Sequence, residues 1–233
     1  PVYDFNQHNG QPYLVMKFVQ GRTLGELLED GPLPPAEMLR IMTAIADALT
    51  YAHEQGVLHR DIKPSNIILD ERNIPYLTDF GLARLVRQGA TSLSQGAMIG
   101  TPYYISPEQA LGQSELDPRT DIYSLGVVLY QLVVGRVPFE GDTPFSIVHD
   151  HIYTPLPAPR SINPEVPPAV ENVLVKALAK DPDARYETAR AMMDAFRQAV
   201  QEAGLVRVSP DRDHGAAESL AEPPQQKAAD GPA

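Results

Sequence analysis

The pattern of hydrophobic and polar residues predicts a hairpin at the start of the chain and helices over most of the rest. Residues 2–5 and 13–19 are rich in aromatic and β-branched residues and flank the turn dipeptide Asn9-Gly10, so we expect a β-hairpin. Two strands alone are marginally stable in water, which predicts that partner strands are missing from this sequence. After Gly21 we expect helices to dominate.

Apolar residues recur at helical spacing from Pro35 to Gln55, and Gly56 ends this predicted helix. Thr23 is placed to cap a shorter helix that reaches Asp30. Four further helices are predicted, at residues 120–134, 143–152, 168–179 and 187–203. The apolar stretch 122–134 is too short to span a bilayer and predicts a buried core helix, so we expect no membrane segment in this chain.

Irregular segments separate these helices. Short extended pieces are predicted at 57–58, 67–69 and 76–78. Residues 81–106 show no period, and so long a stretch inside a compact domain is usually functional. Proline-rich residues 155–167 predict a stiff surface loop rather than a ligand for proline-binding modules. We therefore expect one folded domain over residues 1–204 and a disordered Pro-, Ala- and Gln-rich tail or linker over 205–233.

Composition narrows the class of protein. Apolar residues make up 43% and charged residues 21%, which is typical of a globular protein. The net charge is −11 without a clustered basic stripe, so we expect no nucleic-acid partner. This acidity would favour basic protein substrates, but a surface charged for solubility is the preferred interpretation. The absence of cysteine excludes disulfides and thiolate chemistry and fits a cytoplasmic location.

Four sequence strings carry the chemical information: HRDIKPSN at 59–66, DFG at 79–81, GTPYYISPE at 100–108 and DIYSLG at 121–126. Alone, His-Arg-Asp is most often a surface ion-pair cluster and Asp-Phe-Gly a turn. In this order and spacing they resemble the signature set of the Hanks-type serine/threonine protein kinases of the prokaryotic branch. The resemblance implies an α+β, two-lobed fold, with residues 1–20 as the end of the N-lobe and the hinge and 21–204 as the helical C-lobe.

The residue chemistry fits phosphoryl transfer from ATP, which depends on positioning and on positive charge around the transferred group. Asp61 would act as the catalytic base for the acceptor hydroxyl, and Lys63 would neutralise charge on the γ-phosphate. Asn66 and Asp79 supply oxygen ligands suited to Mg²⁺, with Mn²⁺ as an alternative.

The resemblance also implies nucleotide contacts. Met16 corresponds to the residue at the back of the adenine pocket, and Lys17 to Val19 correspond to the hinge. Ile68 would form the apolar floor of the adenine pocket. In the alternative reading, Met16 and Ile68 are simply core residues.

Several residues are implied to be structural. His59 belongs to the catalytic-loop string, and Phe80 is expected to pack into the core beneath Asp79. Asp121 resembles the buried aspartate that holds the catalytic-loop backbone. Two further residues resemble a buried ion pair that anchors the end of the activation segment, namely Glu108 and Arg185.

Regulation by phosphorylation is implied by Arg60 beside the catalytic aspartate. A phosphate on Thr91, Ser92 or Ser94 would pair with Arg60 and with Arg84.

The implied substrates are proteins with serine or threonine acceptors, including this protein itself by autophosphorylation in trans. Lys63-Pro64 is typical of serine/threonine kinases, and Thr101 resembles the threonine that bonds the catalytic aspartate and lysine. Small-molecule kinases of related fold are a distant second interpretation, because they usually lack these strings.

Three parts of a complete kinase are absent: the glycine-rich loop, the strand lysine and the helix glutamate. The early glycines do not form the loop pattern, and Lys17 falls in the hinge. Because the chain begins with Pro1, we expect a fragment that is inactive alone; a pseudokinase serving as a binding scaffold is the alternative. His149 and His151 do not share a helix face, so we expect ordinary surface or packing residues rather than a metal site.

Overall fold

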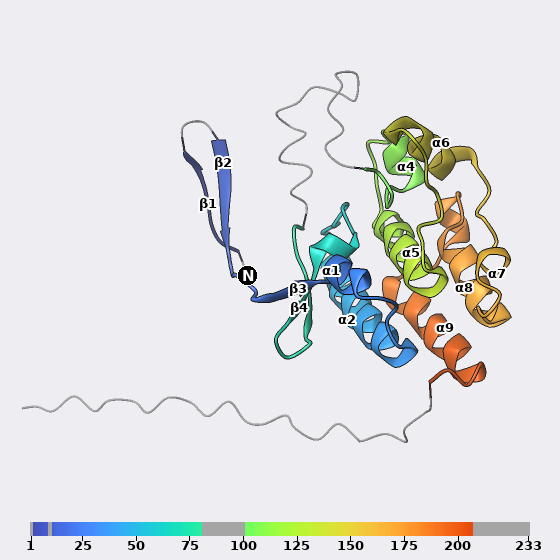
Figure 1. Cartoon of the computed structure of the whole chain (residues 1–233). Coiled ribbons are helices and arrows are strands. Elements are labelled where there is room, and N and C mark those ends of the chain that lie inside the picture. Colours follow the sequence, from blue (N-terminus) through green and yellow to red (C-terminus); the bar gives the residue numbers. More distant parts are fainter. Residues whose placement is uncertain (1, 9–10, 81–100, 207–233) are drawn as a thin grey trace, which may run out of the picture.

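The computed structural model describes residues 2–8, 11–80 and 101–206, which form a mainly helical body with two small antiparallel sheets (Figure 1). The strands are β1 (Val2–His8), β2 (Gln11–Met16), β3 (Gly21–Thr23), β4 (Ile67–Asp70) and β5 (Pro75–Leu77). The longer helices are α1 (Leu24–Glu29), α2 (Pro35–Glu54), α5 (Pro118–Val134), α6 (Pro144–Tyr153), α8 (Pro168–Ala177) and α9 (Ala189–Glu202). The short ones are η1 (Pro64–Asn66), α4 (Pro107–Ala110), α7 (Pro159–Ile162) and η2 (Pro182–Ala184).

The predicted hairpin is confirmed, but its second strand is shorter than expected. Strand β1 pairs antiparallel with β2, and Val2 already lies opposite Met16. Residues 17–19 therefore have no partner strand in the described chain, and Phe18 is highly exposed. In Figure 1 the hairpin lies apart from the helical body.

The second sheet has the order β3-β4-β5, and β3 was not expected. Gly21 pairs with Asp70, and a Cβ at Gly21 would come within 2.0 Å of the Leu69 carbonyl oxygen. Glycine is therefore required for this close approach of two backbones. The strands predicted at 67–69 and 76–78 are confirmed within one residue, whereas the extended piece at 57–58 forms no strand.

Helix α5 forms the centre of the core, as predicted for the apolar stretch within it. It is buried on nearly every side, Asp117 caps its start, and Gly135 ends it with a φ of +95°. Helices α2, α8 and α9 pack around it (Figure 1). Within the described residues, no helix combines the length and apolar character needed to cross a membrane.

The strongly periodic helices are all confirmed to within three residues at each end, and the α+β class is confirmed with them. The short elements η1, α4, α7 and η2 were not predicted, because three or four residues do not complete a helical period. One of them, α7, lies inside the proline-rich stretch that was expected to be a loop. The predicted tail falls almost entirely at 207–233, outside the described residues.

Candidate active site

The loop between α2 and β4 carries a carboxylate that receives two hydrogen bonds from its own loop. Lys63 Nζ donates to Asp61 Oδ2 at 2.7 Å, and Asn66 Nδ2 donates to the same oxygen at 3.1 Å. Asn66 Nδ2 also lies 2.8 Å from the Asp61 backbone oxygen. The side chains of Asp61 and Lys63 are 43% and 37% exposed, so the carboxylate is held in place and remains accessible.

Asp121, at the start of α5, holds the backbone of this loop. Its Oδ2 accepts hydrogen bonds from the His59 backbone N–H and from His53 Nε2, both at 2.8 Å. Its Oδ1 accepts the Arg60 backbone N–H at 2.7 Å. Asp121 has no exposed surface. A carboxylate buried with three donors is satisfied and rigid, so it fixes the loop residues immediately before Asp61.

Two residues at this site have a left-handed backbone. Arg60 has a φ of +68° and Asp79 a φ of +66°, which is uncommon for residues other than glycine. Gln109 Nε2 donates to the Arg60 carbonyl at 2.8 Å, so both peptide groups of Arg60 are fixed from outside the loop. Such conformations persist only where the surroundings impose them.

His59 connects the loop to the segment that carries Asp79. Its Nε2 donates to the Thr78 carbonyl at 2.7 Å, and its Nδ1 accepts the Asp61 backbone N–H at 3.2 Å. Burial lowers the pKa of His59, and the hydrogen bond to Thr78 only partly opposes this. The neutral ring with hydrogen on Nε2 satisfies both contacts.

Phe80 does not pack into the core as expected. Its side chain is 36% exposed, and its ring lies 4.6 Å from the His59 ring at an angle of 59°. A tilted aromatic pair is a favourable arrangement, so the ring stabilises the His59 side chain rather than joining the apolar cluster.

The oxygen donors near the loop suit a hard divalent cation. Asn66 is buried and uses Nδ2 on Asp61, and its Oδ1 has no hydrogen bond among the described residues. Asp79 is half-buried and supplies a carboxylate. The described part of the chain contains no cluster of three or more His, Cys, Asp or Glu that could hold a metal. Two oxygen ligands without a closed protein site fit Mg²⁺, which keeps waters and takes substrate phosphates as ligands.

The residues expected to contact the nucleotide lie in two places, at and just after the end of β2 and on β4. Met16 and Lys17 are exposed and Val19 is half-buried. Ile68 is half-buried on β4 opposite Tyr76 on β5, and Lys17 Nζ lies 5.8 Å from the centroid of the Tyr76 ring. Neither Met16 nor Ile68 belongs to the buried core of the described residues, and their contact with a nucleotide stays a prediction.

Glu108 and Arg185 form a buried bidentate ion pair, with N···O distances of 2.8 and 2.9 Å. The remaining guanidinium donors bind the carbonyls of Arg119, Ala179 and Lys180, so every N–H of Arg185 has an acceptor. Burial tends to raise the pKa of Glu108, but the Arg185 guanidinium outweighs it and holds this pKa below its usual value. The pair joins α4 to the segment before α9.

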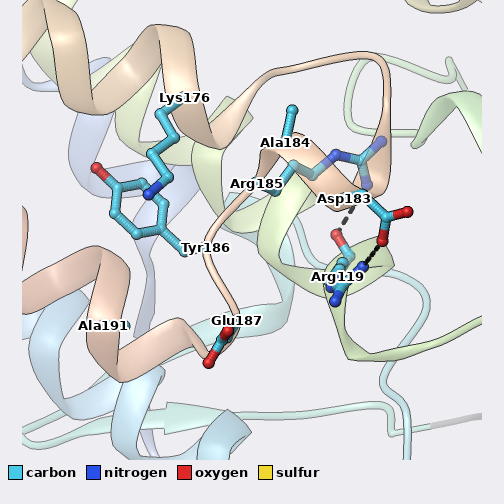
Figure 2. Close-up of a pocket in the computed structure, with 8 residues that line it drawn as sticks. All are labelled: Arg119, Lys176, Asp183, Ala184, Arg185, Tyr186, Glu187 and Ala191. Carbon is cyan, nitrogen blue, oxygen red and sulfur yellow. Dashed lines mark hydrogen bonds and ion pairs between the residues drawn. The ribbon is translucent and has the colours of Figure 1, made fainter.

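A cavity of about 470 Å³, lined in part by Arg185, is open at the surface. Figure 2 shows Arg119 paired with Asp183 at one side and Lys176 along the Tyr186 ring at the other. Its lining includes no residue of the loop 59–66.

The regulatory residues are only partly described. Thr91, Ser92, Ser94 and Arg84 lie outside the described residues. Arg60 Nε is buried and has no hydrogen-bond partner in the part of the chain that the structure describes. The exposed Thr101 makes no side-chain hydrogen bond to Asp61 or Lys63 among these residues; its carbonyl accepts the Tyr103 N–H at 3.0 Å.

Two site residues were missed from the sequence, His53 and Gln109, which support the loop. His53 lies in the last turn of α2, and its contact with Asp121 spans 68 positions, so no local pattern indicates it. His149 is exposed and His151 is fully buried, which fits the prediction of ordinary surface or packing residues that do not share a helix face.

Comparison with known proteins agrees with this geometry. The family model described as the protein kinase domain matches residues 1–197. The chain is 42% identical over 192 residues to serine/threonine-protein kinase PrkC of Bacillus subtilis, covering 82% of this chain and 29% of that protein. It is 41% identical over 197 residues to serine/threonine-protein kinase PknB of Mycolicibacterium smegmatis, covering 82% of this chain and 31% of that protein. The chain thus spans about 30% of the length of these curated relatives.

Proposed function

The chain belongs to the protein kinase family, in its bacterial Hanks-type serine/threonine branch, and from this membership we propose that the protein carrying it transfers the γ-phosphate of ATP to serine and threonine hydroxyls of other proteins. The observation that carries the proposal is the accessible Asp61 carboxylate, held by Lys63 and Asn66 on a loop fixed by Asp121.

In the proposed reaction the acceptor hydroxyl oxygen forms a bond to the γ-phosphorus while the bond from that phosphorus to the β–γ bridging oxygen breaks, and ADP leaves. The hydroxyl proton passes to Asp61. Of its two carboxylate oxygens, Oδ2 receives Lys63 and Asn66, and Oδ1 has no hydrogen bond among the described residues, which leaves Oδ1 to receive this proton. Lys63 offsets the negative charge of the transferring group.

The proposed ligands of the divalent cation are Asn66 and Asp79. When bound, Mg²⁺ neutralises charge on the phosphates of ATP. We place the adenine edge against the backbone of residues 17–19 and its face against Ile68. In this arrangement residues 1–20 end the N-lobe and form the hinge, 21–204 form the C-lobe, and the domain lies in the cytoplasm, where ATP is available.

The proposed acceptor class rests on two features. Lys63-Pro64 follows Asp61 directly, and the segment beginning at Thr101 is attached to the catalytic loop through the bond from Gln109 to Arg60. Lys63-Pro64 is typical of kinases that act on serine and threonine in proteins, and the bond from Gln109 holds the segment that follows Thr101 to the loop. Trans-autophosphorylation is included in this proposal, because the candidate sites at 91–94 are serine and threonine residues of the same chain.

The test uses the protein that contains this chain, incubated with γ-labelled ATP, Mg²⁺ and a generic basic protein, followed by phosphoamino-acid analysis. We expect phosphoserine and phosphothreonine without phosphotyrosine, and loss of at least about 99% of transfer in Asp61→Asn. The matched control is Asp70→Asn, at a β4 carboxylate away from the loop. Normal transfer by Asp61→Asn would overturn the assignment of the base. Binding of ATP without any transfer by the wild-type protein would favour the pseudokinase alternative.

A further inference from the structure

His151, on α6, is a buried histidine whose two ring nitrogens both contact other parts of the chain. Nε2 lies 3.0 Å from the Tyr103 carbonyl oxygen, and Nδ1 lies 3.0 Å from the Tyr123 hydroxyl. A carbonyl only accepts, so Nε2 carries the hydrogen and Nδ1 accepts the hydroxyl of Tyr123. The neutral ring with this one tautomer therefore joins α6, α5 and the segment that precedes α4.

The ring and the backbone of His151 are fixed by further contacts. The Phe139 ring meets the imidazole edge to face, with centroids 5.0 Å apart. Lys180 Nζ donates to the carbonyls of His151 and Asp150 at 2.7 and 2.9 Å and lies 4.4 Å above the Phe139 ring. Lys180 thus supplies a donor to the His151 carbonyl near the C-terminal end of α6 and shares the Asp150 carbonyl with the backbone N–H of Thr154. A side chain held in this way sets the position of whatever it binds.

The group that His151 binds lies in a turn that is anchored at two consecutive residues, Tyr103 and Tyr104. The carbonyl of Tyr103 accepts from His151, and the carbonyl of Tyr104 accepts from Ser124 Oγ at 2.7 Å. The hydroxyl of Tyr104 also donates to Gln131 Oε1 at 2.6 Å. Two neighbouring peptide groups are therefore held by two different helices, α6 and α5, and the segment cannot shift at one without straining the other.

This segment lies next to the catalytic loop. Its continuation into α4 carries Gln109, which donates to the Arg60 carbonyl one residue before Asp61. A substrate hydroxyl at Asp61 places the neighbouring residues of the acceptor peptide along the surface beside that loop. Residues 101–106 lead directly into α4, which the bond from Gln109 holds beside the loop, and residues 101–105 are exposed or half-buried.

We propose that His151 is a positioning residue for the acceptor peptide, acting through the Tyr103 carbonyl on residues 101–106. This inference rests on the proposed kinase function. A histidine that only fills space in the core would affect the stability of the fold and the use of both substrates alike. A positioning residue affects the acceptor peptide more than ATP, because ATP is placed by other residues.

The experiment compares His151 variants of the whole protein, measuring KM for an acceptor peptide, KM for ATP and Tm. His151→Gln places an amide N–H near the position of Nε2 and keeps a donor for Tyr103. His151→Asn is shorter, so its amide falls near Nδ1 and leaves the Tyr103 carbonyl without a donor. We expect a peptide KM about tenfold above wild type for His151→Asn, near wild type for His151→Gln, and an unchanged ATP KM for both. His149→Asn, on the exposed side of α6, is the matched control and should behave as wild type.

The outcomes separate the two proposals. Wild-type protein that transfers no phosphate to protein or peptide would overturn the proposed function itself. Active wild-type protein with equal peptide KM for both His151 variants would overturn the positioning role alone. Equal proportional losses in Tm and in the use of both substrates would assign His151 to packing. If either variant fails to fold, Tyr123→Phe removes only the hydroxyl that orients the ring, and its peptide KM must rise for the inference to stand.

Discussion

Asp121 accepts a hydrogen bond from the backbone N–H of Arg60 at 2.7 Å, across 61 positions of the chain. Arg60 has a left-handed φ of +68°, a conformation that costs on the order of 1–3 kcal/mol where glycine is not present. The buried carboxylate offsets this cost and turns the following residue, Asp61, toward the surface. The central helix α5 therefore sets the geometry of the catalytic loop through one side chain.

Replacing Asp121 by Ala should impair both stability and catalysis. The backbone N–H groups of His59, which is buried, and of Arg60, which is partly buried, would lose their acceptor, at about 1–3 kcal/mol each in free energy of unfolding. A loop displacement near 1 Å is expected to lower kcat by about 100-fold. Urea unfolding and steady-state kinetics measure the two effects, with Glu115→Ala, an exposed acid before α5, as control. A variant with unchanged kcat would contradict the role given to Asp121.

The Glu108–Arg185 pair offers a second test, through a double-mutant cycle. Glu108→Gln or Arg185→Met alone leaves one buried charge without its partner and should lower the free energy of unfolding by about 3–5 kcal/mol. The double variant should lose less than the sum of the two. Arg190→Met is the matched control, because Arg190 and Asp47 form an exposed pair, 56% and 49% exposed, whose loss should cost at most about 1 kcal/mol. Additive losses at 108 and 185 would show that the two residues are not coupled.

The sequence predicted the long helices well because their signals are local. Thr23 and Glu26 form a capping box at α1, and the apolar face of α2 repeats over 20 residues. Strand β3 could not be predicted in this way, because its three residues are strand only through pairing with residues about 47 positions away.

The sequence likewise predicted only part of the candidate site. The string at 59–66 placed Asp61, Lys63 and Asn66 together, and the structure brings them into contact. The supports of that loop come from distant elements, so spacing carried no signal for His53 or Gln109. His151 was interpreted as an ordinary surface or packing residue. Its ring nitrogens bind polar groups from two other parts of the chain, and no local sequence pattern indicates such contacts.

Stability should fall in mild acid because of His151. Burial, with the charge of Lys180, lowers the pKa of His151 from its ordinary 6.5 to about 4. Between pH 4 and pH 6.5 the unfolded state therefore binds more protons than the folded state. The stabilisation that comes from keeping His151 neutral is complete above pH 6.5 and is lost as the pH falls toward 4. Its size between pH 7 and pH 5 is about 2 kcal/mol. Urea unfolding at both pH values measures it, and His151→Gln should show a correspondingly smaller difference; an identical difference would contradict it.

Active protein should carry phosphate on at least one of Thr91, Ser92 and Ser94. The buried Arg60 Nε, without a partner among the described residues, is a donor suited to a phosphate oxygen. Mass spectrometry of an active preparation, before and after phosphatase treatment, measures occupancy and activity together. We expect dephosphorylation to lower the activity of the wild-type protein by about tenfold or more. Dephosphorylation should lower the activity of Arg60→Gln by less, because this variant has no charge at position 60 to pair with a phosphate. Full activity with all three residues unmodified would contradict this switch.

The 233 residues alone should transfer phosphate at least about 1,000-fold more slowly than the protein that contains them. They include Asp61, Lys63, Asn66 and Asp79, but no glycine-rich loop and no strand lysine for the α/β-phosphates. Loss of one preorganised charge contact typically costs about 10²–10³ in rate, and here several contacts to the triphosphate are absent together. ATP would still meet the hinge backbone and the cation ligands, so weak nucleotide binding should remain while its γ-phosphate is poorly placed for attack. The hairpin β1–β2 pairs only with itself among the described residues, so its free edges also predict aggregation.

Both proteins are to be assayed side by side on the same basic protein, with calorimetric titration of ATP and with circular dichroism to establish that the shorter chain is folded. Comparable turnover by the folded 233-residue chain would show that the residues described here suffice to position the triphosphate, and the dependence on the glycine-rich loop and lysine would have to be abandoned.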